Sequence, residues 1–174
     1  MRVKRCINFK VDWILISQRF SIQRNVKEQF LNIFFDVDYT ILGLDNTIRP
    51  GTEDVMERLL TDGHVIYVWS GMGIRWTEVR EHNLAKYVTD CFSKPLENFV
   101  EAVEKQNLLA RPDMVIDDYP EITQALGGVW VRPYLFKNPR DDEMERVYRI
   151  ITDYAKTGHS DDERFRAPPN NSAH

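Results

Sequence analysis

The sequence predicts an α/β protein with a doubly wound, five-stranded parallel sheet covered by helices on both faces. Short apolar segments of strand type alternate five times with segments of helical period, which is typical of this class. The strand segment 64–69 is apolar at five of its six positions, as expected for a strand that is buried on both faces. The length of 174 residues suits one domain of this kind.

The strands are assigned from short apolar runs that stop at polar or turn residues. They are expected at residues 33–35, 64–69, 88–92, 114–116 and 129–131. The helices are assigned from apolar residues at helical spacing and from the turn residues that bound them. They are expected at residues 52–62, 75–86, from 95 onward, 120–126 and 141–155. Pro95 suits the first position of the third helix.

The chain is expected to have three parts. Residues 1–30 carry seven Lys/Arg and two Asp/Glu, a net charge of +5, around an apolar segment too short for a signal peptide. Three interpretations of this basic leader stay open: an element packed on the domain, a flexible arm, or residues outside the functional protein. Residues 31–156 form the expected α/β domain. The polar tail, residues 157–174, is expected to be disordered.

Composition argues against several classes of protein. No apolar run approaches the roughly 20 residues that span a membrane, so we do not expect an integral membrane protein. Cys6 and Cys91 are too few for a disulfide framework or a zinc cluster, which favours a reducing, cytoplasmic location. Residues 31–174 carry 16 Lys/Arg and 25 Asp/Glu, and this net charge of −9 argues against a broad nucleic-acid-binding face.

Polar side chains of related chemistry follow four of the five predicted strands. They are Asp36 and Asp38, Ser70, Lys94, and the pair Asp117 and Asp118. The carboxyl ends of parallel strands meet at one edge of a sheet, where open α/β sheets bind ligands. Each residue taken alone has a structural explanation, as a helix cap, a solvated charge or a turn. Together they supply oxygen ligands for Mg²⁺, a hydroxyl for phosphoryl oxygens and a cation to offset charge.

The order of these residues resembles the haloacid dehalogenase (HAD) superfamily. Its motifs are an Asp-x-Asp-x-Thr strand end, a Ser or Thr strand end, a Lys, and an acidic pair after another apolar strand, and residues 33–132 contain all four. Only 11 residues separate Thr40 from Thr52, and only 23 lie between Ser70 and Lys94. Neither position at which the family inserts a cap domain has room for one, so the resemblance implies a capless member.

The resemblance implies a Mg²⁺-dependent phosphomonoester hydrolase that forms an aspartyl phosphate. Asp36 would be the nucleophile, and Asp38 would act first as general acid and then as general base. Lys94 would keep Asp36 ionised and neutralise developing charge, while Ser70 would bind a phosphoryl oxygen. An Asp at position 38 is unlike the dehalogenase branch, which lacks that acid.

The resemblance also implies which residues bind phosphate and metal. The phosphate group would be bound by Thr40, Ser70, Gly71 and Lys94. The metal would be bound by the Asp36 carboxylate, the Asp38 main-chain carbonyl and Asp118, with Asp117 as a neighbour that orients the ligands.

Two other functions stay open. A phosphoacceptor signalling domain also combines an acidic cluster, a central Asp, a Ser or Thr and a Lys, but there the acidic pair precedes the phosphorylated Asp. A catalytically silent binding module would keep the scaffold, and the retention of every charged group counts against it.

The substrate is expected to be a phosphorylated small molecule or a nucleotide, with a protein or a nucleic-acid end as alternatives. A capless site is open, and a second subunit is one source of a lid. Several loop residues near the active edge could hold the rest of a substrate. They are Arg49, Arg75, Trp76, Arg132, Tyr134 and Lys137.

Overall fold

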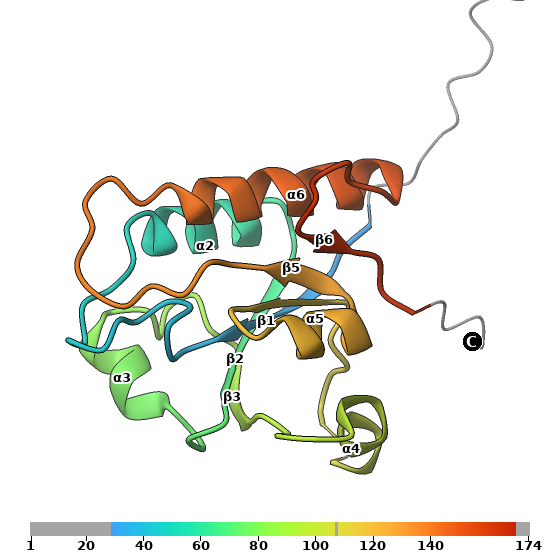
Figure 1. Ribbon diagram of the computed structural model, residues 1–174, viewed down its shortest axis with the longest axis horizontal. Coiled ribbons are helices and arrows are strands. Elements are labelled where there is room, and N and C mark those ends of the chain that lie inside the picture. The colour runs from blue at the N-terminus through green and yellow to red at the C-terminus, as the bar shows by residue number, and fades with distance from the viewer. Residues whose placement is uncertain (1–28, 107, 170–174) are drawn as a thin grey trace, which may run out of the picture.

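The computed structural model describes residues 29–106 and 108–169, which form one mixed sheet with helices on both faces (Figure 1). The strands are β1 (Asn32–Asp36), β2 (Val65–Ser70), β3 (Asp90–Ser93), β4 (Met114–Asp117), β5 (Gly128–Trp130) and β6 (Phe165–Arg166). The helices are α2 (Thr52–Thr61), α3 (Trp76–Glu81), α4 (Phe99–Lys105), α5 (Pro120–Leu126) and α6 (Glu143–Thr157). All but two residues of the leader, 1–30, lie outside the described residues, so its three interpretations stay open.

The strand order is β3-β2-β1-β4-β5-β6, and the first five strands are parallel. The chain moves outward from β1 to β3, returns to the other side of β1 with β4, and then moves outward again. This confirms the predicted doubly wound fold. Since the order reverses between β1 and β4, the carboxyl ends of these two strands flank the switch point at which such sheets bind ligands.

The sheet has one strand more than the five expected. Strand β6 pairs antiparallel with the edge strand β5, and Phe165 lies opposite Val129. Phe165 is buried, with its ring centroid 5.3 Å from that of Tyr154 on α6. Burial of this aromatic ring favours docking of an otherwise polar segment. The expectation of a disordered tail is therefore wrong for residues 157–169.

Two predicted helices are shorter than expected. Helix α3 ends at Glu81 rather than at residue 86, and Asn83 just beyond it has a φ of 58°. Helix α4 begins at Phe99 rather than at Pro95, because Asn98 has a φ of 48°. A left-handed residue cannot continue a right-handed helix. Residues 95–98 consequently form a loop at the carboxyl edge of the sheet.

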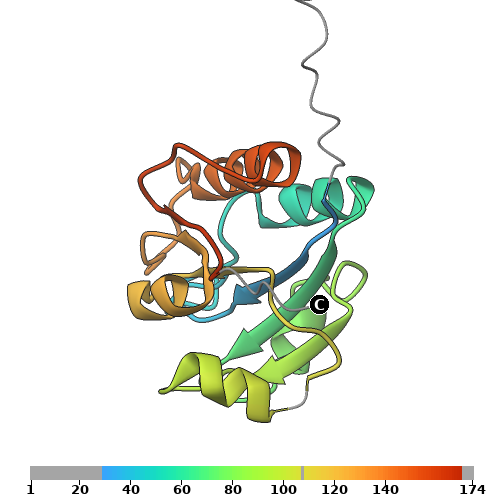
Figure 2. The same ribbon diagram turned by 90° about the vertical axis from the view of Figure 1, so that its right-hand side faces the viewer.

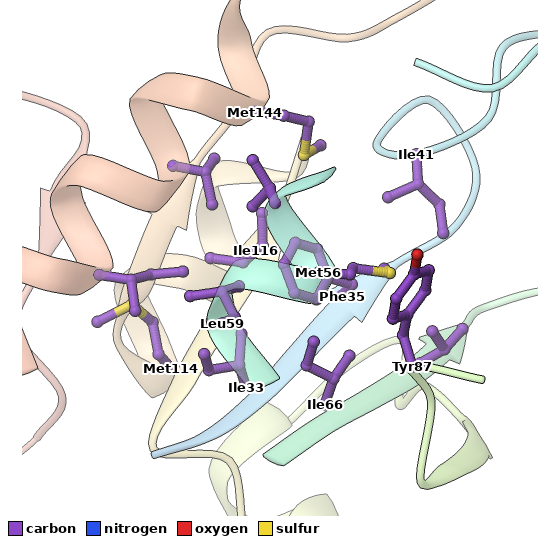
Figure 3. Packing of buried hydrophobic residues seen from close by; sticks show 14 of the residues in the cluster. Ile33, Phe35, Ile41, Met56, Leu59, Ile66, Tyr87, Met114, Ile116 and Met144 are labelled. Carbon is purple, nitrogen blue, oxygen red and sulfur yellow. The ribbon is translucent and has the colours of Figure 1, made fainter. Parts of the chain in front are cut away.

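Side chains alternate along the buried strands, so each strand contributes to a core on both faces. Phe34 packs with Tyr67 and Trp69 on the face covered by α4 and α5. Figure 2 shows α4 on the opposite side of the sheet from α2 and α6. Figure 3 shows the cluster under α2 and α6, whose labelled members include Ile33, Phe35, Met56, Leu59, Ile66, Met114, Ile116 and Met144.

The two positions at which a cap domain could be inserted are short in the structure. Residues 37–51 form a loop between β1 and α2, and residues 71–89 contain only α3 and its connections. The carboxyl edge of the sheet is therefore not covered by a domain inserted at either position. Within the described ranges, no helix is long and apolar enough to cross a membrane.

Candidate active site

The residues predicted from the strand ends meet at the carboxyl edge of the sheet. Asp36 is the last residue of β1, and Asp117 is the last residue of β4, its neighbour across the switch point. Ser70 ends β2, and Lys94 follows β3, with its backbone N–H donating to the Ser70 carbonyl at 2.9 Å. Parallel pairing thus brings together four segments that are far apart in the sequence.

Lys94 bridges two buried carboxylates. Its Nζ lies 2.7 Å from Asp36 Oδ1 and 3.0 Å from Asp117 Oδ2. The Asp36 and Asp117 side chains are only 3% and 0% exposed, so water cannot compensate their charge. The second oxygen of Asp117 accepts the N–H of Tyr119 at 3.0 Å. Both carboxylates are therefore held in place by the chain itself.

The carboxylates outnumber the cation between them. Asp36, Asp117 and Asp118 each offer one carboxylate oxygen, and these oxygens lie within 4.8 Å of one another. Burial raises the pKa of Asp36 well above its ordinary value; Asp117 raises it further and Lys94 opposes the shift. Burial also raises the pKa of Asp117 to about 6. Convergent carboxylate oxygens with negative charge in excess are a donor set that fits Mg²⁺.

Asp38 has surroundings unlike those of Asp36. Its Oδ2 accepts a hydrogen bond from Ser70 Oγ at 2.7 Å, and its Oδ1 lies 3.1 Å from Arg75 Nη2. Ser70 Oγ in turn accepts the N–H of Met72 at 2.9 Å. The Asp38 side chain is 33% exposed, so this carboxyl group can exchange protons with solvent.

The other two residues predicted to bind phosphate lie in different places. Thr40 is fully buried, and its Oγ1 accepts the N–H of Asp118 at 3.1 Å, so it holds the backbone beside the acidic cluster. Gly71 lines the pocket described below, and a Cβ atom there would lie 2.8 Å from Leu96 Cδ2. The role of both residues in binding phosphate stays a prediction.

A pocket of ≈ 580 Å³ contains the candidate reacting groups. Its charged lining residues are Asp36, Asp38, Lys94 and Asp118. Most of the remaining wall is apolar and was not among the predicted site residues. It consists of Tyr39, Met72, Pro95, Leu96, Phe99, Tyr119 and Ile122; the one other lining residue, Gly71, was predicted to bind phosphate. The sequence carried a signal for two of them, since Leu96 lies two residues after Lys94 and Tyr119 directly follows Asp118.

Two of the six loop residues expected near the substrate are buried elsewhere. Arg49 and Tyr134 are 1% and 2% exposed, so the expectation that they hold a substrate is wrong. Arg49 donates to the Thr40 carbonyl at 2.9 Å and to the Arg132 carbonyl, and its Nε lies 3.3 Å from Asp141 Oδ1. Arg49 therefore ties together three segments of the chain.

The other four loop residues stay predictions as substrate contacts. None of them lines the pocket, and two already have ionic partners: Arg75 with Asp38, and Arg132 with Glu143 at 3.0 Å. The remaining two are Trp76 and Lys137.

Comparison with known proteins finds a likeness among solved structures only. No protein-family model matches the sequence, and no curated protein matches it. Among solved structures, the chain is similar to a Vibrio cholerae protein provisionally assigned as a 3-deoxy-D-manno-octulosonate 8-phosphate phosphatase. The match covers 78% of this chain and 89% of the other, with 15% sequence identity and a TM-score of 0.45. A similarity of this size gives no information on the site, so the function proposed below depends on the site residues.

Proposed function

We propose that this chain is a HAD-type phosphomonoester hydrolase that forms an aspartyl phosphate at Asp36. The observation that carries the proposal is the difference between two neighbouring carboxylates. Asp36 is buried and paired with Lys94 at 2.7 Å, whereas Asp38 is one-third exposed and bonded to Ser70 and Arg75. A nucleophile needs a fixed, charge-paired oxygen, and a general acid and base needs access to protons. The two environments match these two tasks.

The first chemical step would transfer the phosphoryl group to the enzyme. An oxygen of Asp36 attacks phosphorus while the bond between phosphorus and the ester oxygen breaks. Asp38 donates a proton to the departing oxygen, so the product leaves as an alcohol. Lys94 holds the attacking carboxylate and offsets negative charge on the phosphoryl oxygens.

The second step would restore the enzyme. A water molecule attacks phosphorus in the aspartyl phosphate, and Asp38, now ionised, accepts a proton from that water. The bond between phosphorus and the Asp36 oxygen breaks, which releases inorganic phosphate and regenerates both carboxyl groups. One exposed acid thus serves both steps, while the buried one carries the covalent bond.

Asp36, Asp117 and Asp118 would hold Mg²⁺, because their oxygens converge and Lys94 offsets only part of their charge. The bound ion would supply positive charge where negative charge accumulates on the phosphoryl group. Thr40 would support this site through its hydrogen bond to the Asp118 backbone. The substrate is proposed to be a small phosphorylated molecule, since a pocket of ≈ 580 Å³ has the size of a small-molecule site.

Incubation of the purified chain with p-nitrophenyl phosphate and Mg²⁺ tests the proposal. Many turnovers per chain are expected, and Asp153→Asn, a change at an exposed acid away from the pocket, should keep them. One stoichiometric phosphorylation by an acyl phosphate donor, without turnover, would instead identify a phosphoacceptor domain. No reaction of either kind would indicate a binding module.

A further inference from the structure

We infer that the substrate's leaving group is an apolar ring carrying no second anionic group, such as an arylmethyl alcohol. The inference rests on the proposed phosphatase function and names the substrate class of that same site. Its basis is the apolar wall that shares a pocket with Asp36 and Lys94. In a bound substrate whose phosphorus faces Asp36, the ester oxygen lies on the opposite side of phosphorus, so the leaving group would extend away from Asp36 into this pocket.

The wall offers surfaces that suit a planar apolar group. Three of its residues are aromatic, Tyr39, Phe99 and Tyr119, and they are joined by Met72 and Leu96. Aromatic rings pack favourably against other rings at their faces or edges, and the thioether of methionine adapts its shape to ring edges. A ring bound here would lie between side chains from the loops that follow β1, β2, β3 and β4.

Several apolar side chains of the pocket wall are exposed and are not part of the hydrophobic core. Met72 is 78% exposed, Leu96 is 73% exposed and Tyr119 is 52% exposed. All three lie outside both hydrophobic clusters of the core. A contiguous exposed apolar surface in a soluble protein commonly marks a site that binds a ligand. Here the surface adjoins the candidate reacting groups, so the leaving group is the ligand that would cover it.

The charges of the pocket exclude a second anionic group on the substrate. Lys94 is the only cation among the described residues that line the pocket, and both Asp36 and Asp117 already pair with it. Arg75, outside the lining, pairs with Asp38 at 3.1 Å and also contacts Glu78. A second phosphate or a carboxylate would therefore find no unpaired cation in the described lining, and burying a charge without such a partner is costly.

A sugar is also a poor fit to this wall. Hydroxyl groups that faced the hydrocarbon of Leu96 and Phe99 would lose hydrogen bonds to water that these two side chains cannot replace. The apolar ring of an arylmethyl group loses no hydrogen bond in the same place. The wall therefore favours the ring over the sugar by both packing and desolvation.

Steady-state kinetics with three alkyl phosphates test this inference on the full chain with Mg²⁺. The substrates are benzyl phosphate, ethyl phosphate and glycerol 3-phosphate. All three release an alcohol of similar basicity, so a difference in kcat/KM reports contacts with the leaving group rather than its reactivity. The value for benzyl phosphate is expected to exceed the other two by about tenfold or more.

Two variants connect such a preference to the wall. Leu96→Ala and Tyr119→Ala truncate side chains that are more than half exposed, so both proteins should fold. Each is expected to lower the ratio of kcat/KM for benzyl over ethyl phosphate at least about threefold. A general loss of stability would lower both values and leave the ratio unchanged. Leu109→Ala, at a leucine that is 86% exposed and outside the pocket, should keep the wild-type ratio.

The possible failures are distinguishable. Equal kcat/KM values for the three esters, a preference for glycerol 3-phosphate, or an unchanged ratio in both wall variants would overturn the inference and leave the phosphatase in place. Turnover of none of these esters, and of no p-nitrophenyl phosphate either, would overturn the proposed function and the inference with it.

Discussion

Two cations lie near the carboxyl edge of the sheet, the buried Arg49 and the partly buried Lys94, and their surroundings differ. Arg49 has a balanced environment: it donates to the backbone carbonyls of Thr40 and Arg132 and lies 3.3 Å from one carboxylate, Asp141. One carboxylate lies at ion-pair distance from its charge, and one backbone oxygen accepts from each of its two terminal nitrogens. We call these residues the Arg49 cluster.

Lys94 has an unbalanced environment. It lies within 3.0 Å of two carboxylates, Asp36 and Asp117, and Asp118 adds a third to the same acidic group. One positive charge therefore faces three acidic groups, and burial raises the pKa of each of them. We call these four residues the Lys94 cluster.

The comparison separates a cluster that stabilises the fold from one that is suited to a ligand. A buried charge whose partners are all supplied by the chain contributes to the folded state, and losing one partner is costly. A buried cluster with excess charge is destabilising until something else offsets that charge. The two clusters should consequently respond in opposite ways when one member is neutralised.

Asp36→Asn should have the largest effect on activity and little cost in stability. The amide is a poor nucleophile, so kcat/KM for p-nitrophenyl phosphate should fall at least about a thousandfold. Without metal, the melting temperature should stay the same or rise, because one of three repelling carboxylates is removed. Turnover like that of the wild type would take the nucleophile role away from Asp36.

Arg49→Met should have the largest effect on stability. It leaves Asp141 and the carbonyls of Thr40 and Arg132 without their partner, so the free energy of unfolding should fall by about 3–5 kcal/mol. Urea denaturation monitored by circular dichroism measures the change. Arg140→Met, at an exposed arginine next to Asp141 in the chain, should cost less than about 0.5 kcal/mol. Similar losses in the two variants would contradict the view that the Arg49 cluster is structural.

The Lys94 cluster also predicts a pH dependence of the metal-free protein. The pKa of Asp117 is raised from its ordinary value of 3.8 to about 6, so the folded chain keeps this proton to higher pH than the unfolded chain does. As pH rises from about 4 to about 6, this group therefore lowers the free energy of unfolding by a total of about 3 kcal/mol. The effect is absent below that window and complete above it.

Asp117→Asn removes this contribution together with the part of the Asp36 pKa shift that Asp117 causes, and both changes act in the same direction. Urea denaturation in EDTA should show the variant gaining stability relative to the wild type as pH rises from 4 to 7. The informative quantity is the difference in unfolding free energy between the two proteins at each pH. Acidic groups on the surface are the same in both proteins, so their titration cancels in this difference. A constant difference across the range would mean that Asp117 ionises at its ordinary pKa.

Bound Mg²⁺ should offset the excess negative charge of the Lys94 cluster and so stabilise the folded protein. This is the smallest of the four predicted effects. A ligand at about 100 times its Kd raises the free energy of unfolding by about 2.7 kcal/mol. The corresponding rise in melting temperature should be much smaller for Asp118→Ala, which lacks one of the three oxygen donors. Asp153→Ala, at an exposed acid outside the cluster, should keep the full shift. Equal shifts in the wild type and Asp118→Ala would place any bound metal elsewhere.

The sequence by itself determined the doubly wound class and which strand ends carry reactive groups. Both depend on local patterns: strand segments such as 64–69 are apolar at nearly every position, and polar residues such as Ser70 follow where burial stops. Parallel pairing then makes neighbours of these ends whatever the details of packing. For this reason Asp36, Lys94 and Asp117 could be placed at one edge before any contact was known.

Only the tertiary structure decided what each of these groups touches. In the sequence, Arg49 looks like any other charged loop residue. Its burial depends on two carbonyls and a carboxylate, and these come from segments up to 92 residues away. Strand β6 depends on a space between β5 and α6 that one phenylalanine fills. The apolar wall of the pocket likewise joins four loops. Contacts between distant segments have no local periodicity, and so composition and spacing cannot reveal them.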